Sequence, residues 1–447
     1  MKSRANWNIA FEISPLLAAS GSFGDKSGVY RLGFNQIKYL SEYLISVKSE
    51  QQIYLYTLQP PLQYNMSLDL FQLLQKPNIQ FMYGPFLKHA LLRDRKIFDH
   101  FILRFVAKKV DKYFYQPLVE RILFARYVSV VQKMLIRKKI KVVHHSESGF
   151  VPYRQVANII HINDVIPFLF PFWQRKKAVG IHDAKVKFAN RYCQGVICIS
   201  ENTKKDFIKL SKAPKFTSSN KPDVKVIYLG IEKFASSKES SIRVLNNIVA
   251  QSGWNEIKDK KYFLYFGTIE PRKNITSLMM VFHNLKITGK LADYKLVIMG
   301  GRGWGKIYDQ AQNFIRENFP IRAESPIIML DFLSDDHLAS FIRHAYAVVY
   351  PSIYEGFGLP VIESLQFGIP VITSNTSSLP EAGGDACLYV DPKNPEELSN
   401  AIVKLARDKK LYRRLSALGI KHVKQFDWKK NAAETYKFYT SLLKRRQ

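Results

Sequence analysis

The stretch AYAVVYPSIYEGFGLPVIES, residues 345–364, contains the signals of a strand, a tight turn and a helix in direct succession. AYAVVYPS is rich in branched and aromatic residues, which favour a buried strand. EGFG is a turn sequence, and Pro360 suits the first turn of a helix because its missing amide hydrogen is not needed there. Strand, glycine turn and helix form the repeating unit of a doubly wound parallel sheet, in which ligands bind beyond the carboxyl ends of the strands.

The same alternation of short apolar runs and longer helical patterns extends over the whole chain. The runs are NIAFEI, QIYLYTL, KVVHHS, VANIIHI, GVICIS, VKVIYLG, YFLYFGT, YKLVIMG, PIIMLDF, AYAVVYPS, PVITS and ACLYV. This order predicts an α/β protein with two doubly wound parallel-sheet, Rossmann-like domains. The polar stretch at 232–260 lacks a strand, so we expect an N-terminal domain at 1–231 and a C-terminal domain at 232–427. The helical pattern at 428–447 is a candidate to pack back on the first domain.

Composition excludes several classes of protein. An apolar content of 47% over 447 residues indicates globular domains rather than disorder. No segment reaches the ~20 uninterrupted apolar residues that cross a bilayer. The N-terminal stretch reads as a first buried strand rather than a secretion signal, because Glu12 and Pro15 interrupt its apolar region. Cys193, Cys198 and Cys387 show no metal-type spacing, so we expect neither disulfides nor zinc, and a cytoplasmic location.

The formal net charge of +30 requires an anionic partner. Residues 85–141 carry 15 Lys/Arg against 4 Asp/Glu, and residues 404–447 carry 14 against 3. The first segment also mixes aliphatic and aromatic residues with cations at helical spacing, which is typical of attachment to an anionic membrane surface. A solvated basic face over a core-facing stripe is the alternative. A nucleic-acid-binding protein would also explain the charge, but no such motif is visible, so nucleic acid is not an expected partner.

Two glycine turns follow strands in the second half of the chain. YFLYFGTIEPRKNI places Arg272 and Lys273 ahead of a helix, and two cations at a helix N-terminus favour a diphosphate. A solvated basic cap is the alternative. YKLVIMGGRGWGKI resembles a phosphate loop, but Ile307 stands where a magnesium-binding hydroxyl is needed, which indicates an ordinary glycine loop.

Two carboxylates, Glu355 and Glu363, flank the predicted helix start in the opening stretch. The amides of Phe357, Gly358 and Leu359 can approach a phosphate closely, since glycine presents no side chain. Carboxylates repel phosphate but accept hydrogen bonds from sugar hydroxyls. The pattern therefore predicts a site for a nucleotide sugar, with a helix-dipole role as the alternative for Glu363.

Residues 262–407 resemble the family 4 glycosyltransferases. The resemblance lies in GTIEPRKN, in LVIMGGRGWG, and in the segment from LDFLSDDHL to CLYVDP, which includes a Glu-x7-Glu motif. SGVYRLGFNQIKYL, HINDVIPFLFP and GVICISENTKKDF are similar to landmarks of the family's first domain. The resemblance implies the GT-B fold, in which two Rossmann-like domains face each other across a cleft, and a retaining enzyme that uses a nucleotide-sugar donor.

Carried over to this chain, the resemblance implies a role for each motif residue. Arg272 and Lys273 would clamp the diphosphate, Glu363 would bind the ribose, and Glu355 would hold the transferred sugar. The other residues expected near the donor are Gly28, Gly267, Asp331, Phe332, Leu333, Gly356, Phe357, Gly358 and Leu359, with Asp331 to Leu333 meeting the base.

This chain departs from the family pattern in two places. Thr268 follows the strand glycine where many members have arginine, so the phosphate charge would rest more heavily on Arg272 and Lys273. On the acceptor side, Asn163 precedes Asp164 where the family usually has histidine. Asn163 carries no titratable proton, and His161 is a candidate substitute, with a structural histidine as the alternative.

No Asp-x-Asp occurs in the chain, so we expect transfer without a metal or other cofactor. The resemblance implies same-face attack, with a donor phosphate oxygen accepting the acceptor's proton. It also favours mannose, and hence GDP-mannose, as the donor. The expected acceptor is a glycan, lipid-linked on the inner membrane face, in cell-surface polysaccharide or lipopolysaccharide assembly. A nucleotide-sugar epimerase of the same fold is the alternative function.

Overall fold

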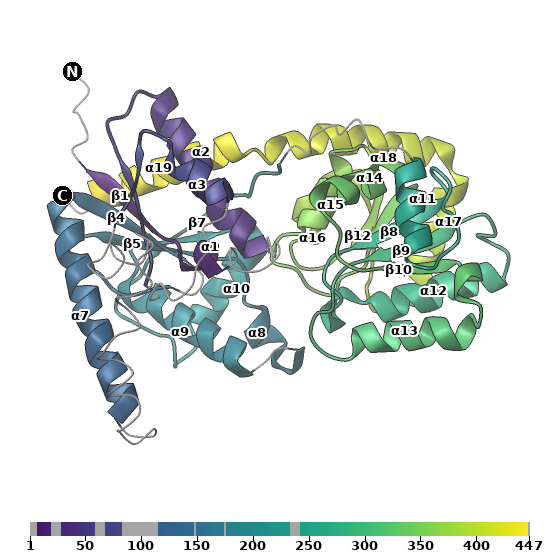
Figure 1. Cartoon of the computed structure of the whole chain (residues 1–447), viewed down its shortest axis with the longest axis horizontal. Coiled ribbons are helices and arrows are strands. Elements are labelled where there is room, and N and C mark those ends of the chain that lie inside the picture. Colours follow the sequence, from purple (N-terminus) through teal and green to yellow (C-terminus); the bar gives the residue numbers. More distant parts are fainter. Residues whose placement is uncertain are drawn as a thin grey trace, which may run out of the picture.

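The computed structural model describes residues 7–18, 28–58, 68–82, 115–146, 149–173, 176–232 and 242–445. Figure 1 shows two α/β domains side by side, each with a central sheet between layers of helices. All strand pairs in both sheets are parallel. The prediction of two doubly wound parallel-sheet domains is therefore confirmed.

The first sheet has seven strands in the order β3-β2-β1-β4-β5-β6-β7. The strands are β1 (Asn8–Glu12), β2 (Ile53–Tyr56), β3 (Ile79–Phe81), β4 (Ile140–His145), β5 (Ala157–Ile162), β6 (Gly195–Cys198) and β7 (Asp223–Val226). The helices are α1 (Ser14–Ala18), α2 (Gly28–Ser46), α3 (Leu68–Leu74), α7 (Tyr115–Arg137), α8 (Ile166–Leu169), η1 (Pro171–Trp173), α9 (Lys176–Tyr192) and α10 (Glu201–Ser211). The strand order reverses between β1 and β4, so ligand sites are expected beyond the ends of these two strands.

The second sheet has six strands in the order β10-β9-β8-β11-β12-β13. The strands are β8 (Tyr262–Phe266), β9 (Lys295–Met299), β10 (Ile327–Leu330), β11 (Ala347–Tyr350), β12 (Val371–Ser374) and β13 (Cys387–Val390). The helices are α11 (Ile242–Gln251), η2 (Pro271–Lys273), α12 (Ile275–Ile287), α13 (Ile307–Asn318), η3 (Arg322–Glu324), α14 (Asp335–His344), α15 (Leu359–Leu365), α16 (Leu379–Gly383), η4 (Gly384–Ala386), α17 (Pro395–Arg407), α18 (Lys409–His422), η5 (Val423–Gln425) and α19 (Trp428–Lys444). Here the order reverses between β8 and β11.

The strands form because their side chains are buried on both faces of each sheet, as parallel sheets require. Every residue of β8 is buried, which explains the continuous apolar run YFLYF. The edge strand β3 was not predicted. Only Ile79 of its three residues is buried, and the strand pairs on one side with β2, so its sequence carries little apolar signal.

The last helix, α19, lies along α2 of the first domain (Figure 1). Its residues Phe438, Tyr439 and Leu442 are buried in one apolar cluster with residues of β1 and α2. A Cβ at Gly195 would lie 2.6 Å from Leu442, so a glycine at the start of β6 permits this close approach. Trp428, at the start of α19, belongs to the core of the second domain. One helix thus joins the two cores.

The basic segment at 85–141 is described only in part, because 83–114 lie outside the described residues. Arg137 at the end of α7 and Lys139 beyond it are exposed, whereas Lys138 lies over the ring of Tyr54, 5.4 Å from its centroid. In the portion of the chain that is described, no helix combines the length and apolarity needed to cross a bilayer.

Candidate functional site

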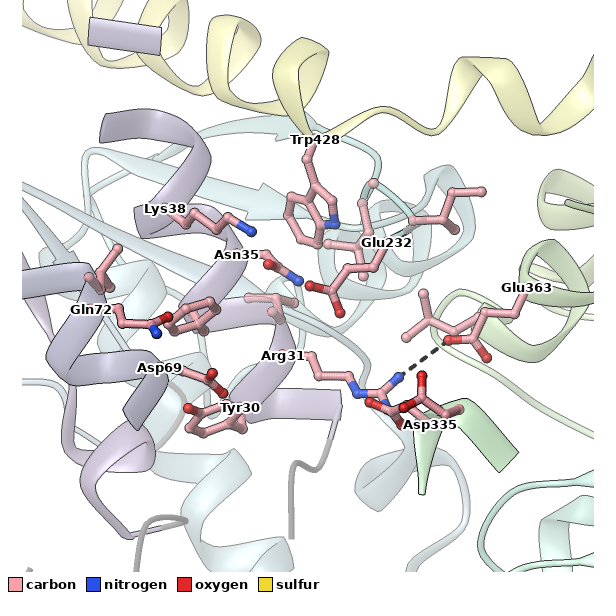
Figure 2. A pocket seen from close by; sticks show the side chains of 18 of the residues that line it. Tyr30, Arg31, Asn35, Lys38, Asp69, Gln72, Glu232, Asp335, Glu363 and Trp428 are labelled. Atoms are coloured by element: carbon pink, nitrogen blue, oxygen red, sulfur yellow. Dashed lines mark hydrogen bonds and ion pairs between the residues drawn. The ribbon is translucent and has the colours of Figure 1, made fainter. Parts of the chain in front are cut away.

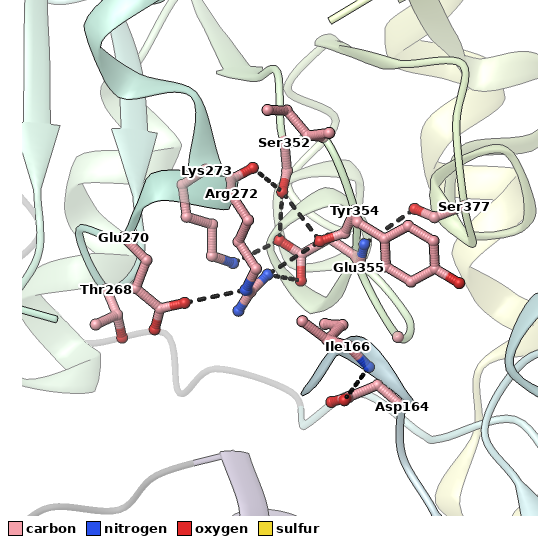
Figure 3. Close-up of polar contacts among 12 residues, drawn as sticks. Asp164, Ile166, Thr268, Glu270, Arg272, Lys273, Ser352, Tyr354, Glu355 and Ser377 are labelled. Atoms are coloured by element: carbon pink, nitrogen blue, oxygen red, sulfur yellow. Dashed lines mark hydrogen bonds and ion pairs between the residues drawn. The ribbon is translucent and has the colours of Figure 1, made fainter. Parts of the chain in front are cut away.

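The carboxylate of Glu355 lies where the carboxyl ends of β8 and β11 meet (Figure 3). Tyr350, the last residue of β11, and Ser352 each donate a hydrogen bond to Glu355 Oε1 at 2.8 Å. The short helix η2, which follows β8, supplies Arg272 and Lys273. Because β8 and β11 are neighbouring parallel strands, residues far apart in sequence converge at this edge.

Arg272 and Lys273 both form ion pairs with Glu355. Arg272 Nη1 lies 2.6 Å from Oε2, and Lys273 Nζ lies 2.6 Å from Oε1. Arg272 Nε also pairs with Glu270 Oε2 at 3.0 Å. Figure 3 shows the two cations pointing at the same carboxylate. The predicted clamp and the predicted sugar-binding acid are therefore one cluster, in which two carboxylates balance two cations.

Burial and charge act in opposite directions on this cluster. Burial raises the pKa of Glu355, but the charges of Arg272 and Lys273 outweigh it and bring the pKa down to about 2. Burial, followed by the charge of Arg272, lowers the pKa of Lys273 from its ordinary value. Glu355 is therefore ionised at neutral pH, and it can accept hydrogen bonds from hydroxyls.

The glycines of the turn meet steric demands within the protein itself. A Cβ at Gly356 would lie 2.2 Å from the backbone oxygen of Asn163, which belongs to the first domain. Ser200, also of the first domain, donates a hydrogen bond to the Gly356 carbonyl at 2.7 Å. Gly358 has φ 109° and precedes α15. Phe357 is buried, and Leu359 begins α15. The turn is thus held against the first domain, while its contact with phosphate stays a prediction.

Glu381 makes a second contact between the domains. Its carboxylate accepts hydrogen bonds from the backbone amides of Glu201 and Asn202, at 2.7 Å and 2.8 Å, and so caps the N-terminus of α10. The Tyr228 hydroxyl donates to the same carboxylate at 3.1 Å. These contacts join the first-domain segments after β6 and β7 to α16 of the second domain.

Glu363 faces a different space from Glu355. A cavity of about 420 Å³ lies between α2 and α3 of the first domain and α14 and α15 of the second, and Glu363 lines it. Arg31 reaches from α2 across this cavity, with Nη1 3.6 Å from Glu363 Oε1, and also pairs with Asp335 (Figure 2). Burial raises the pKa of Glu363 to about 7, with Arg31 opposing the rise and Asp335 adding to it.

Sequence reasoning missed Arg31, although it lies three residues after Gly28 in a motif that was singled out. Gly28 is the first residue of α2. The residues around Arg31 in the sequence give no sign that would distinguish it from the many surface lysines and arginines of the chain. Its importance depends on the second domain, to which it points.

The other predicted donor residues lie on turns of the second domain. Gly267 follows β8 with φ 129°, and a Cβ at Gly300 would lie 2.0 Å from the Gly267 carbonyl oxygen, so the turns after β8 and β9 pack directly together. Asp331 accepts a hydrogen bond from the Tyr308 hydroxyl at 2.6 Å. Phe332 is 64% exposed and Leu333 is half-buried. Their contact with a base stays a prediction.

The predicted acceptor-side residues divide between the interior and the domain contact. His161 is buried in β5, with Nδ1 2.7 Å from His144 Nε2, and burial followed by the charge of Lys185 lowers its pKa to about 3. This environment is that of a structural histidine. Asn163 lies against Gly356, and Asp164 accepts a hydrogen bond from the Ile166 amide at 3.0 Å, at the start of α8.

Glu12 is a buried acid that the sequence analysis did not select as a site residue. It ends β1, beside the point where the first sheet reverses its order. The backbone amides of Ser14 and Leu58 donate to its Oε1 at 3.0 Å and 3.1 Å, and Ser146 donates to Oε2. Burial raises its pKa despite these donors. Glu12 thus ties together the loops that follow β1, β2 and β4.

No cluster of three or more His, Cys, Asp or Glu side chains suited to a metal ion occurs among the residues that the structure describes.

The sequence is similar to proteins whose names describe glycosyl transfer. Residues 249–422 match the family described as glycosyl transferases group 1. O-antigen chain mannosyltransferase B of Escherichia coli is 27% identical over 302 residues, which cover 67% of this chain and 74% of that protein. O-antigen chain mannosyltransferase RfbU of Salmonella typhimurium is 32% identical over 173 residues, 38% of this chain and 46% of that protein. The serotype-specific mannosyltransferase WbdA of Escherichia coli is 29% identical over 198 residues, 43% of this chain and 24% of that protein.

Solved structures resemble both domains together. Sucrose-phosphate synthase from Thermosynechococcus elongatus gives a TM-score of 0.60 at 18% identity, covering 98% of this chain and 100% of that one. WaaG, a glycosyltransferase involved in lipopolysaccharide biosynthesis, gives a TM-score of 0.58 at 13% identity, covering 97% of this chain and 99% of that one. At these identities the likeness concerns the fold alone.

Proposed function

This chain belongs to the family 4 glycosyltransferases, has their GT-B fold and uses a nucleotide-sugar donor, and from that premise we propose that it is a retaining mannosyltransferase acting on a glycan. The proposed donor is GDP-mannose. The proposed acceptor is a lipid-linked glycan of cell-surface polysaccharide or lipopolysaccharide assembly.

The observation that carries the proposal is the cluster of Arg272, Lys273 and Glu355 at the joined ends of β8 and β11. Glycosyl transfer leaves a diphosphate on which negative charge develops. Preorganised cations stabilise that charge without reorganising during the reaction. In the free protein Glu355 and Glu270 balance the two cations, and in the complex the donor's diphosphate shares them.

Glu355 has a second proposed role beside charge balance. Its pKa of about 2 keeps it ionised, so its oxygens are acceptors for the hydroxyls of the transferred sugar. Glu363 receives the ribose hydroxyls. The acceptor hydroxyl attacks the face from which the diphosphate departs, and its proton passes to a donor phosphate oxygen. The new glycosidic bond then replaces the bond to phosphate with the same configuration, and no metal takes part.

The choice of mannose is supported by three relatives, O-antigen chain mannosyltransferase B, RfbU and WbdA, whose names specify mannosyl transfer. The basic segments at 85–141 and 404–447 support attachment to an anionic membrane at its cytoplasmic face. In the second segment Lys409, Lys410, Arg413 and Arg414 are exposed on α18.

The test has two steps. GDP-mannose, GDP, UDP-glucose and UDP are compared by thermal shift, since a ligand that binds the folded state raises its melting temperature. Mannose transfer is then followed with labelled GDP-mannose and a lipid-linked mannoside, with and without EDTA. We expect GDP-mannose to stabilise the protein and transfer to survive EDTA. Stabilisation by UDP-glucose alone would overturn the choice of donor, and conversion of the sugar without an acceptor would favour an epimerase.

A further inference from the structure

Arg31 is a first-domain residue whose charged partners belong to the second domain. Arg31 lies on α2, and its guanidinium pairs with Asp335 of α14 and with Glu363 of α15. The distance from Arg31 Nη1 to Glu363 Oε1 is 3.6 Å. In Figure 2 the side chain of Arg31 extends across the cavity toward both acids. Its side chain is 22% exposed and that of Glu363 is 14% exposed, so this contact is largely shielded from water.

The other cations that line the described part of this cavity have partners within their own domain. Lys76 Nζ pairs with Glu42 of α2 at 3.0 Å, and Lys38 Nζ lies 5.2 Å from the centroid of the Tyr39 ring. Arg31 therefore differs from Lys38 and Lys76 in that its partners lie in the other domain. The difference points to a role in the second domain's ligand site.

We propose that Arg31 is a positioning residue for donor binding. It reaches across the cavity, orients the Glu363 carboxylate and keeps it in position to accept hydrogen bonds from the ribose hydroxyls. The inference rests on the proposed function, in which Glu363 binds ribose. A carboxylate accepts two hydroxyl donors, whereas a protonated acid offers a weaker acceptor. Contact between the domains thereby contributes to nucleotide affinity, although Arg31 itself need not touch the nucleotide.

The charges around Glu363 agree with this role. Burial favours the protonated acid, and Asp335 and Glu232 act in the same direction, whereas Arg31 favours the ionised form. With these effects combined, the pKa of Glu363 is about 7. Removal of Arg31 takes away the opposing cation, so the pKa rises further and the carboxylate becomes scarcer at neutral pH.

The experiment measures GDP binding by calorimetry for the full chain and for Arg31→Gln, Arg31→Lys and Lys76→Gln at several pH values. We expect Arg31→Gln to weaken GDP binding roughly fivefold at pH 7, because a rise of about one unit in the pKa of Glu363 lowers its ionised fraction from about a half to about a tenth. The deficit shrinks as the pH is raised to 9, because Glu363 then ionises without help. Arg31→Lys is expected to retain most of the affinity. Lys76→Gln, which removes another cation that lines the cavity, is the control, and its affinity for GDP should stay within about twofold of wild type.

A second ligand makes the readout specific to ribose. Wild type is expected to bind GDP more tightly than 2′,3′-dideoxy-GDP, and Arg31→Gln is expected to lose most of that difference in affinity. An altered fold or a general loss of positive charge would weaken the binding of both ligands alike. Unchanged affinity and preference in Arg31→Gln would overturn the inference and leave the proposed function intact. An equal loss in Lys76→Gln would also overturn it. Binding of neither GDP nor UDP by wild type would remove the proposed function and this inference together.

Discussion

Gly356, in the turn after β11 of the second domain, lies directly against the backbone carbonyl of Asn163 in the first domain, so closely that a Cβ would sit 2.2 Å from the carbonyl oxygen. The contact is between two backbones, and neither can move away as a flexible side chain could. Next to it, Ser200 and Thr203 donate hydrogen bonds to the Gly356 carbonyl at 2.7 Å and 3.1 Å. The position of Glu355, one residue earlier, therefore depends on the arrangement of the two domains.

Gly356→Ala is expected to lower turnover by about tenfold or more, because the added methyl group separates the domains and displaces Glu355. Gly180→Ala is the matched control, since a Cβ there meets nothing within 4 Å and the site lies inside helix α9. This control should gain up to ~1 kcal/mol in unfolding free energy and keep full activity. Steady-state kinetics and urea unfolding of both variants check the prediction. Wild-type turnover in Gly356→Ala would show that the domain contact plays no part in catalysis.

Arg272→Ala and Lys273→Ala should each lower turnover by roughly 10²-fold, because in the proposed mechanism each removes charge that stabilises the leaving diphosphate. Each also leaves the buried Glu355 with one cation fewer, so we expect unfolding free energy to fall by about 3 kcal/mol. Activity is therefore measured at a temperature where unfolding curves show both variants folded. Lys290→Ala removes an exposed cation of the same domain and should change neither quantity. Near-normal turnover in both folded variants would contradict the assignment.

Stability should fall in acid because of buried neutral histidines. Burial lowers the pKa of His161 to about 3 and that of His145 to about 4, whereas the ordinary value is 6.5. Between about pH 6.5 and 4 the unfolded chain therefore binds more protons than the folded chain, and the free energy of unfolding falls as the pH falls. Glu363 has the opposite effect, because its pKa is raised from the ordinary 4.5 to about 7. Between these pH values the folded chain binds more protons at Glu363, so its contribution to the free energy of unfolding grows as the pH falls.

The contribution of His161 is isolated by comparison with His161→Gln. Urea unfolding of both proteins at several pH values should give a shallower acid loss in the variant, by at most ~1.4 kcal/mol per pH unit. Carboxylate effects common to both proteins cancel in the difference. Identical slopes would mean that His161 titrates normally in the folded protein, and would return it to the acceptor-side role that its burial argues against.

Attachment to anionic membranes is expected to weaken when Arg137 and Lys139 become Glu. Both side chains are exposed at the end of α7, and each cation near such a surface contributes about 1 kcal/mol. Lys138 lies between them in the same basic segment, but it lies over Tyr54 and its replacement would also disturb packing. Co-sedimentation with anionic and neutral liposomes, at low and high salt, measures the effect, and Lys258→Glu with Lys290→Glu is the charge-matched control. Equal binding to neutral liposomes would reject the electrostatic mechanism.

The second domain was predictable from local pattern to a greater extent than the first. Each of its strands has a run of branched or aromatic residues, as in YFLYF of β8, because parallel strands are buried on both faces. β3 in the first domain carries one buried residue and lies at the sheet edge, so its burial depends on a neighbour that the sequence does not reveal.

The sequence identified the residues of the candidate site but not their arrangement in space. Strand-turn-helix signals and a family resemblance identified Arg272, Lys273, Glu355 and Glu363. The ion pair of Lys273 with Glu355 joins residues 82 positions apart, and it follows from the strand order that sets β8 beside β11. Similarly, the partners of Arg31 lie on α14 and α15 of the other domain.

By itself, the sequence determined the α/β class, the two doubly wound domains and the turns that carry the candidate site, because burial on both faces of a strand and the backbone needs of a glycine turn are local properties. The tertiary structure alone decided that Glu355 pairs with both Arg272 and Lys273, that His161 is enclosed beside His144, and that Gly356 meets Asn163. These relations depend on distances between segments remote in the chain, and such distances arise only when the sheets are ordered and the domains are in contact.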